Sequence, residues 1–125
     1  MFKKIIDYLK NKLFRIIYKK ILKQRKKNFE ILYNFYCIFN KSIKIKVKFL
    51  NEEYFIIDQK KKYKFFPIER IWVYERGLIH RSKTLSKNYL LQNIKFRDND
   101  IIIDVGANNG DFYLCFDKKI KYYAY

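Results

Sequence analysis

The stretch IIIDVGANNGD, residues 101–111, decides the fold class of this chain. Its first three residues, 101–103, form a continuous apolar run that is typical of a strand buried on both faces of a parallel sheet. Asp104 stands at the carboxyl end of that strand, residues 111–116 can open a helix, and residues 121–125 can form a second strand. A strand, a glycine turn, a helix and a second strand make a βαβ unit, so the sequence predicts an α/β fold.

The turn inside this stretch has the chemistry of a site for a charged ligand. Two of the three glycines, Gly106 and Gly110, and one of the two alanines, Ala107, lie within five residues. Glycine lets the backbone turn sharply and lets a ligand approach without a Cβ in the way. Free amides at a helix start attract an anion, and Asp104 can meet the cationic end of the same ligand. The G-x-x-x-G spacing leaves an ordinary tight turn and a dinucleotide-binding oxidoreductase as alternatives, the latter weakened by the missing third glycine.

Residues 104–112, DVGANNGDF, resemble the first motif of the FkbM family of S-adenosylmethionine-dependent methyltransferases. The likeness covers roughly residues 70–125, and the first 65 residues carry none that we identify. The approach to the motif is similar to that of the family at Arg76-Gly77, Arg81, Leu85, Tyr89-Leu90 and the DIIID lead-in of residues 100–104.

The resemblance implies a Rossmann-like class I methyltransferase domain, of which this chain holds the first βαβ unit. It implies that S-adenosylmethionine is the cofactor and that a hydroxyl of a sugar, a glycan or a small molecule is the methyl acceptor. No side chain can be assigned as the catalytic base, although His80, Asp98 and Asp100 are near the motif. The resemblance places the methionine part of the cofactor against Asp104, Gly106, Ala107, Asn108, Asn109 and Gly110.

We expect the chain to be an N-terminal fragment of such an enzyme. The acid that holds the ribose hydroxyls is expected about 20 residues past the glycines, which falls beyond Tyr125. The remaining strands and the acceptor pocket are also not in the sequence. We therefore expect no methyl transfer by these 125 residues alone. We also expect an apolar edge of the two-stranded remnant to be exposed, which favours poor solubility.

Residues 2–27 predict a basic amphipathic helix, with eleven Lys and Arg against one acid, Asp7. Three interpretations are open: docking on anionic lipid with snorkelling Lys side chains, packing against its own domain, and contact with nucleic acid, which is the least favoured. The alternative function for the whole chain is accordingly a basic module that binds a membrane or nucleic acid and has no enzymatic activity. The apolar positions follow i, i+3, i+4 spacing at Phe2, Ile5, Ile6, Leu9, Leu13, Ile16, Ile17 and Ile21.

The middle of the chain predicts a second helix and a small antiparallel meander. Residues 28–39 form the helix, with Phe29, Leu32, Tyr33, Tyr36 and Phe39 on its core face. Strict alternation over residues 43–49 indicates a strand with one buried face. Residues 54–58 and 63–66 read as the next two strands, with turns at 51–53 and 60–62.

Two further helices are expected before the glycine motif. Pro67 suits the first turn of the earlier one, and Gly77 can end it in a left-handed conformation. The later one should run from about residue 78 or 82 to residue 91. The expected organisation is then a helical segment at 1–41, the meander and helices at 42–99, and the methyltransferase unit at 100–125.

Charge and cysteine usage bear on compartment. The formal net charge of +17 is partly a by-product of a composition rich in Lys, Ile, Phe, Tyr and Asn, so it is weak evidence for a nucleic-acid partner. Cys37 and Cys115 form no paired motif, and His80 is too isolated to anchor a metal. The longest run without a charged residue, 31–40, is too short to span a membrane. We expect a protein in the cytoplasm or on the membrane face that meets it.

Overall fold

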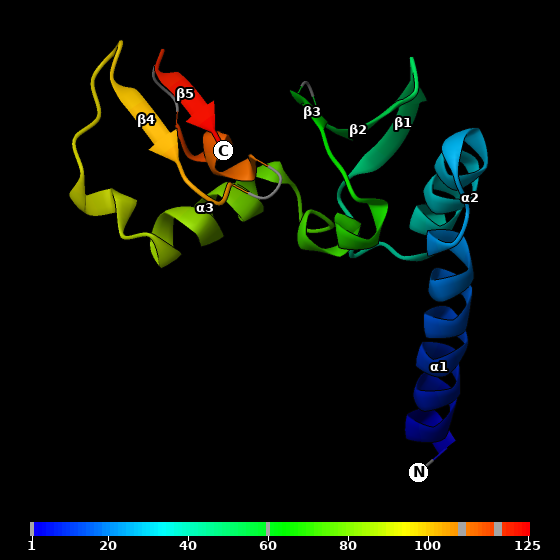
Figure 1. Cartoon of the computed structure of the whole chain (residues 1–125). Helices are drawn as coiled ribbons and strands as arrows, with labels where there is room; N and C mark the ends of the chain where they lie inside the picture. Colours follow the sequence, from blue (N-terminus) through cyan, green and yellow to red (C-terminus); the bar gives the residue numbers. More distant parts are fainter. Residues whose placement is uncertain (1, 60, 108–109, 117–118) are drawn as a thin grey trace.

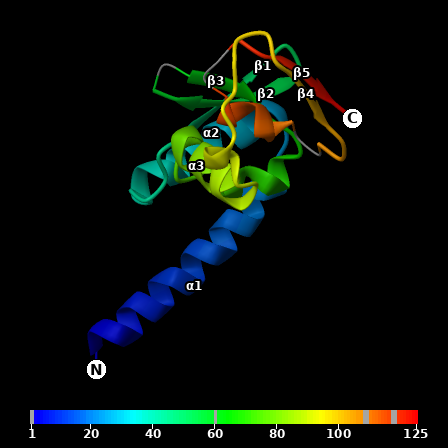
Figure 2. The same ribbon diagram turned by 90° about the vertical axis from the view of Figure 1, so that its left-hand side faces the viewer.

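The computed structural model describes residues 2–59, 61–107, 110–116 and 119–125. Figure 1 shows a mixed α/β arrangement with two small sheets and a long N-terminal helix. This helix, α1 (Phe2–Leu22), projects from the rest of the molecule in both views (Figures 1 and 2). Only its last turns join the core, so most of α1 stands away from the fold.

The second helix, α2 (Lys26–Phe39), packs beside the end of α1. The predicted first helix is therefore five residues too long, because the chain turns at residues 23–25. Arg25 takes extended backbone with φ −134° and donates from its guanidinium to the Leu22 carbonyl at 2.8 Å. The α2 backbone then begins with the Lys26 N–H donating to the Tyr54 hydroxyl. These bonds satisfy carbonyl and amide groups that helix ends leave unpaired.

The predicted meander is present as a sheet with strand order β1-β2-β3. Its strands are β1 (Lys46–Leu50), β2 (Glu53–Asp58) and β3 (Lys61–Lys64), and both pairings are antiparallel. β1 begins three residues later than expected, although the alternation of buried residues starts at Ile43 as predicted.

The expected turn at residues 60–62 and strand at residues 63–66 are shifted. Lys61 and Lys62 pair with Asp58 and Ile57, so they belong to β3. The chain reverses earlier because Gln59 adopts a left-handed φ of 54°. Lys side chains are suited to this edge strand, since one face of it meets solvent.

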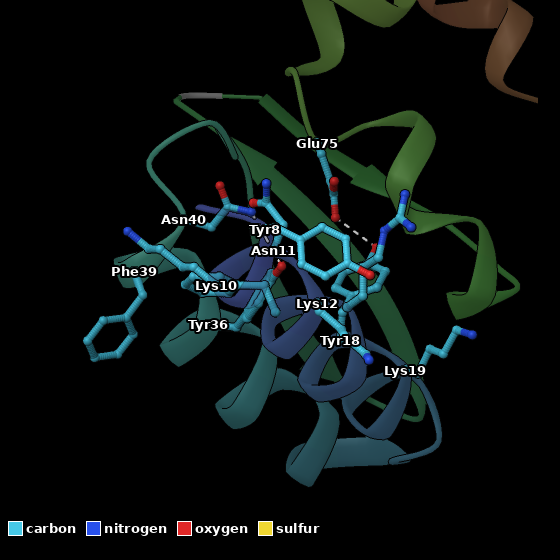
Figure 3. A pocket seen from close by; sticks show the side chains of 12 residues that line it. Tyr8, Lys10, Asn11, Lys12, Tyr18, Lys19, Tyr36, Phe39, Asn40 and Glu75 are labelled. Carbon is cyan, nitrogen blue, oxygen red and sulfur yellow. Dashed lines mark hydrogen bonds between the residues drawn. The ribbon is translucent and has the colours of Figure 1, made fainter. Parts of the chain in front are cut away.

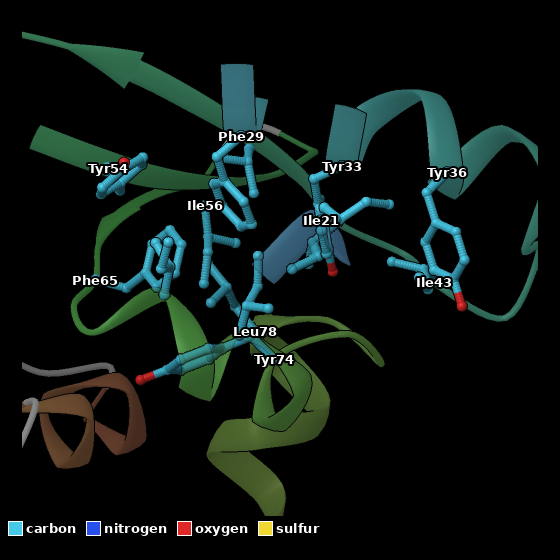
Figure 4. Packing of buried hydrophobic residues seen from close by; sticks show 14 residues of the cluster. Ile21, Phe29, Tyr33, Tyr36, Ile43, Tyr54, Ile56, Phe65, Tyr74 and Leu78 are labelled. Atoms are coloured by element: carbon cyan, nitrogen blue, oxygen red, sulfur yellow. The ribbon is translucent and has the colours of Figure 1, made fainter. Parts of the chain in front are cut away.

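The core lies between α2 and the three-stranded sheet, and Figure 4 shows its packing. Leu32 and Phe39, which we expected in the core, are exposed, because α2 packs through the narrower face formed by Phe29, Tyr33 and Tyr36. Asn34 also ties α2 to β1, donating to the Val47 carbonyl and accepting from its N–H at 2.7 and 2.8 Å. The buried apolar residues of the cluster are Ile21, Phe29, Tyr33, Tyr36, Ile43, Ile45, Val47, Tyr54, Ile56, Phe65, Ile68, Ile71, Tyr74 and Leu78.

The contribution of α1 to this core differs from the predicted stripe. Ile21 is buried, whereas the other described members of that stripe are exposed. The residues of α1 packed with Ile21 are Phe14, Tyr18 and Leu22, which occupy the opposite side of the helix. A helix with two apolar faces can bury either one, so its spacing alone does not say which face the fold uses.

The segment after Pro67 is a 3₁₀ helix, η1 (Ile68–Val73), and it ends before Gly77. The prediction that Gly77 ends this helix is wrong, because Gly77 immediately precedes α3 (Leu78–Asn88). Its φ is +101°, and a Cβ there would lie 2.9 Å from Asp58 Oδ2. That carboxylate accepts the Leu78 N–H at 2.7 Å, so β2 holds the first turn of α3.

The two parallel strands of the predicted βαβ unit are present, but the α-helix expected between them is not. β4 (Ile101–Asp104) and β5 (Lys121–Ala124) pair in parallel, in the register Ile101↔Lys121 to Asp104↔Ala124. The connecting element is a 3₁₀ helix, η3 (Asp111–Cys115), where we predicted an α-helix at residues 111–116. A second 3₁₀ helix, η2 (Leu91–Asn93), precedes β4.

The burial expected for β4 is not found. Ile101 and Ile103 are 61% and 64% exposed, because the sheet of β4 and β5 has only these two strands among the described residues. The expectation that this two-stranded sheet exposes apolar residues is confirmed.

Candidate cofactor-binding turn

The turn between β4 and η3 has the backbone that its glycines were expected to provide. Gly106 and Gly110 have φ of +78° and +66°, in the left-handed region. A Cβ on either glycine would meet nothing within 4 Å, so the space beside both is open. Asn108 and Asn109, which we also assigned to the cofactor, lie outside the described residues. The described part of the turn is therefore accessible, and the left-handed φ at Gly106 and Gly110 favours glycine at these two positions.

Three described amides of this turn, those of Gly106, Ala107 and Gly110, already donate hydrogen bonds. Gly106 and Ala107 donate to the Tyr125 carbonyl at 2.8 and 3.0 Å, and Gly110 donates to the Ala107 carbonyl at 2.8 Å. The Tyr125 N–H in turn donates to the Asp104 carbonyl at 3.0 Å, which extends the parallel pairing by one residue. An anionic ligand would have to displace the Tyr125 carbonyl to reach the first two amides.

Asp104 is half-buried at the carboxyl end of β4, as predicted, but it already has a partner. The Tyr122 hydroxyl donates a hydrogen bond to Asp104 Oδ2. Burial raises the pKa of Tyr122 above its ordinary value of 10.0, and the bond to Asp104 and its charge raise that pKa further. Sequence reasoning missed Tyr122, although the period of two would have placed it on the same face as residue 124, which pairs with Asp104.

Asp111 is an anchor for the turn. It is 8% exposed, and its Oδ2 accepts hydrogen bonds from Arg81 Nε at 2.8 Å and from the Tyr74 hydroxyl at 3.2 Å. The same oxygen lies 2.7 Å from Arg81 Nη2 in an ion pair. Arg81 lies on α3 and Tyr74 is part of the core, so these bonds fasten the start of η3 to the rest of the fold. With two hydrogen bonds and an ion pair on one oxygen of a buried carboxylate, Asp111 has a structural role here.

Aromatic side chains pack around η3, the element that follows the turn. The ring of Phe112 lies 4.8 Å from that of Tyr89 and 5.2 Å from that of Phe116, and Phe116 lies 4.9 Å from Phe96. Tyr113 contacts Tyr122 at 5.6 Å. These edge and tilted contacts hold η3 between α3 and the parallel strands.

A separate groove of about 910 Å³ lies between α1 and the carboxyl end of α2 (Figure 3). Glu75 lies in it and accepts hydrogen bonds from the hydroxyls of Tyr18 at 2.7 Å and Tyr33 at 3.2 Å. Burial raises the pKa of both phenols, and the Glu75 carboxylate adds to the shift. Its rim is basic, with Lys10, Lys12, Arg15 and Lys19 among the lining residues. None of the described residues of the glycine turn lines this groove.

The comparisons with family models, with curated proteins and with solved structures give no match for this chain. Among the described residues, no group of three or more His, Cys, Asp or Glu side chains lies where it could hold a metal ion. Within the same part of the chain, no helix has the length and apolar content needed to cross a membrane.

Proposed function

We propose that residues 100–125 are the first strand–turn–helix–strand unit of an S-adenosylmethionine-dependent O-methyltransferase of Rossmann-like fold. The observation that carries the proposal is the parallel β4–β5 pair, with two left-handed glycines and a carboxylate at the end of the first strand. In open α/β sheets, ligands bind outside the carboxyl ends of the strands, which is where this turn lies. The resemblance of residues 104–112 to the FkbM motif narrows the ligand to S-adenosylmethionine.

The described residues fit the methionine part of this cofactor. Its ammonium group is complementary to the Asp104 carboxylate, and the open space beside Gly106 and Gly110 would admit its chain. Its carboxylate would reach the amides of Gly106 and Ala107 by displacing the Tyr125 carbonyl. The cofactor supplies the transferable methyl group when bound. The role of this chain is to hold and orient the donor, and the proposed acceptor is a hydroxyl of a sugar, a glycan or a small molecule.

The uncovered face of β4 supports the second part of the proposal, that this unit works within a larger domain. Ile101, Ile103 and Val105 are all exposed, and in a doubly wound sheet such residues are covered by helices. We therefore propose that the 125-residue chain transfers no methyl group by itself.

The test is a titration of the isotopically labelled chain with S-adenosylmethionine, followed by the amide chemical shifts of residues 104–110. We expect saturable shifts there, and none with NAD, which probes the oxidoreductase alternative. Absence of shifts with S-adenosylmethionine would overturn the cofactor assignment, and shifts with NAD alone would replace it. Methyl transfer to any sugar acceptor by this chain would overturn the proposal of inactivity.

A pair of variants separates a binding role of Asp104 from a structural one. Asp104→Asn removes the charge that meets the ammonium group and keeps an acceptor for Tyr122, so binding should weaken by about tenfold. Tyr122→Phe frees the Asp104 carboxylate and should leave binding unchanged or tighter. If both variants weaken binding equally, the Asp104–Tyr122 bond only supports the turn.

A further inference from the structure

The strongest unexplained surface of the molecule is one side of α1. The large apolar side chains on this side are each between 39% and 60% exposed, and they recur at three- and four-residue intervals along the helix. We call this surface the α1 stripe. Its residues are Ile5, Ile6, Leu9, Leu13, Ile16 and Ile17.

The stripe points away from the fold because α1 packs through its other side. Phe14, Tyr18 and Ile21 contact the core, and in an α-helix they lie roughly opposite Leu9 and Leu13. Figures 1 and 2 show the helix standing clear of both sheets, so no described element covers the stripe. Among the described residues, α1 therefore packs against its own fold through one side and leaves the stripe uncovered.

The charges on α1 indicate what could cover the stripe. The helix carries seven Lys and Arg residues against one acid. By helical geometry Lys10 borders the stripe on one side, and Lys12 and Lys19 border it on the other. Figure 3 shows these exposed side chains extending from the helix, with Lys12 and Lys19 at the rim of the basic groove. An apolar band bordered by long cations is suited to a lipid surface, where the cations reach the headgroups.

We propose that α1 docks in the plane of an anionic lipid bilayer, with the α1 stripe at the acyl boundary and its flanking Lys residues at the headgroups. A second copy of the chain fits less well, because two molecules of net charge +17 repel each other. Nucleic acid would satisfy the cations and leave the apolar stripe in water. This docking is independent of whether residues 100–125 bind a cofactor.

The first experiment is sedimentation of the full chain with phosphatidylcholine vesicles, with and without phosphatidylglycerol. We expect binding to the mixed vesicles, with steep weakening by salt. Leu13→Gln should lower the partition coefficient by about tenfold, because it removes one apolar side chain from the boundary. The matched control is Ile79→Gln on α3, which changes an equally exposed isoleucine off the stripe and should have no effect. Lys12→Gln should weaken binding by about fivefold.

A depth measurement separates insertion from charge attraction. In a Trp72→Phe background, Leu13→Trp should show a blue-shifted emission with vesicles and be quenched by brominated acyl chains. Ile79→Trp in the same background should show neither. Wild-type-like binding by Leu13→Gln together with loss in Lys12→Gln would mean attraction without insertion, and would overturn the proposal. So would a dimer in solution that Leu13→Gln dissociates, or binding of RNA in place of vesicles.

Discussion

The two sheets of this protein both contain apolar strands, but they differ in what covers those strands. The three-stranded antiparallel sheet buries alternate residues such as Ile45, Val47 and Ile56 under α2. The two-stranded parallel sheet leaves Ile101 and Ile103 exposed, and beyond Leu85 only Asp111 is buried among the described residues. Alternation needs one partner layer, which this chain supplies, whereas a continuous apolar strand needs two.

The difference shows that two strands can pair in register even where their apolar side chains are not buried. β4 and β5 form their register without a core around them, held at one end by the bonds of Asp111 to Arg81 and Tyr74. The stability of the antiparallel half should therefore depend on apolar packing, and that of the parallel half on a few polar contacts.

The largest expected effect tests packing in the two sheets with the same substitution. Ile56→Ala leaves a cavity in a fully buried site and should lower the free energy of unfolding by about 2–5 kcal/mol. Ile103→Ala changes an exposed residue and should cost no more than about 0.5 kcal/mol. Urea denaturation followed by circular dichroism measures both. Equal losses would show that β4 is buried in solution and would remove the contrast.

The next effect concerns the polar anchor of the parallel half. Asp111→Asn weakens a buried ion pair with Arg81 and should cost about 2 kcal/mol. Hydrogen exchange should show faster opening of residues 101–104 with little change in the antiparallel sheet. The matched control is Glu69→Gln, which breaks an exposed pair with Arg25 and should cost less than about 0.5 kcal/mol. Uniform destabilisation by Asp111→Asn would mean that the two halves unfold as one unit.

Two glycine substitutions compare a crowded site with an open one. Gly77→Ala places a Cβ 2.9 Å from Asp58 Oδ2 at a φ of +101°, and should cost about 3 kcal/mol. Gly106→Ala has only the conformational cost of a φ of +78°, about 1 kcal/mol, since nothing lies within 4 Å. Thermal denaturation measures both variants, and Gly77→Ala should lower the melting temperature more than Gly106→Ala does. The reverse order would show that the glycine turn is packed against something in solution.

The smallest effect at neutral pH is that of Cys37, a half-buried thiol on α2. Burial raises the pKa of Cys37 from 9.0 to about 12, and the charge of Glu75 contributes to the rise. The folded state therefore keeps the proton where the unfolded state loses it. This contribution to stability is complete below pH 9.0 and declines as the pH rises toward about 12. Cys37→Ala should flatten the alkaline loss of stability measured by urea denaturation across that range, and an unchanged slope would contradict the assignment.

Sequence patterns predicted the presence of the helices and strands better than the residues at which they begin and end. Alternation from Ile43 to Phe49 and the glycines after Asp104 located both sheets, because side-chain period and backbone conformation are local properties. The shift of β3 depended on a left-handed Gln59, and the 3₁₀ form of η3 depended on its packing, neither of which has a local signal in these residues.

The candidate site was predicted in outline and missed in its contacts. Asp104, Gly106 and Gly110 lie together at the carboxyl end of β4 as expected. The Tyr122 bond to Asp104 and the Tyr125 bonds to the turn amides were not foreseen, because they join residues 18 or more positions apart. Arg81 and Asp111 both belong to the stretch that resembles the FkbM family, but only the fold brings them into contact.

The amino-acid sequence by itself determined which segments of this chain are helical, which are extended, and where the backbone must be glycine. These properties follow from interactions among neighbouring residues. Tertiary structure alone decided that α1 packs through Phe14, Tyr18 and Ile21 and leaves its other apolar side uncovered. It also decided that the turn amides meet Tyr125. Burial depends on what the rest of the chain places beside a surface, and no local pattern encodes that.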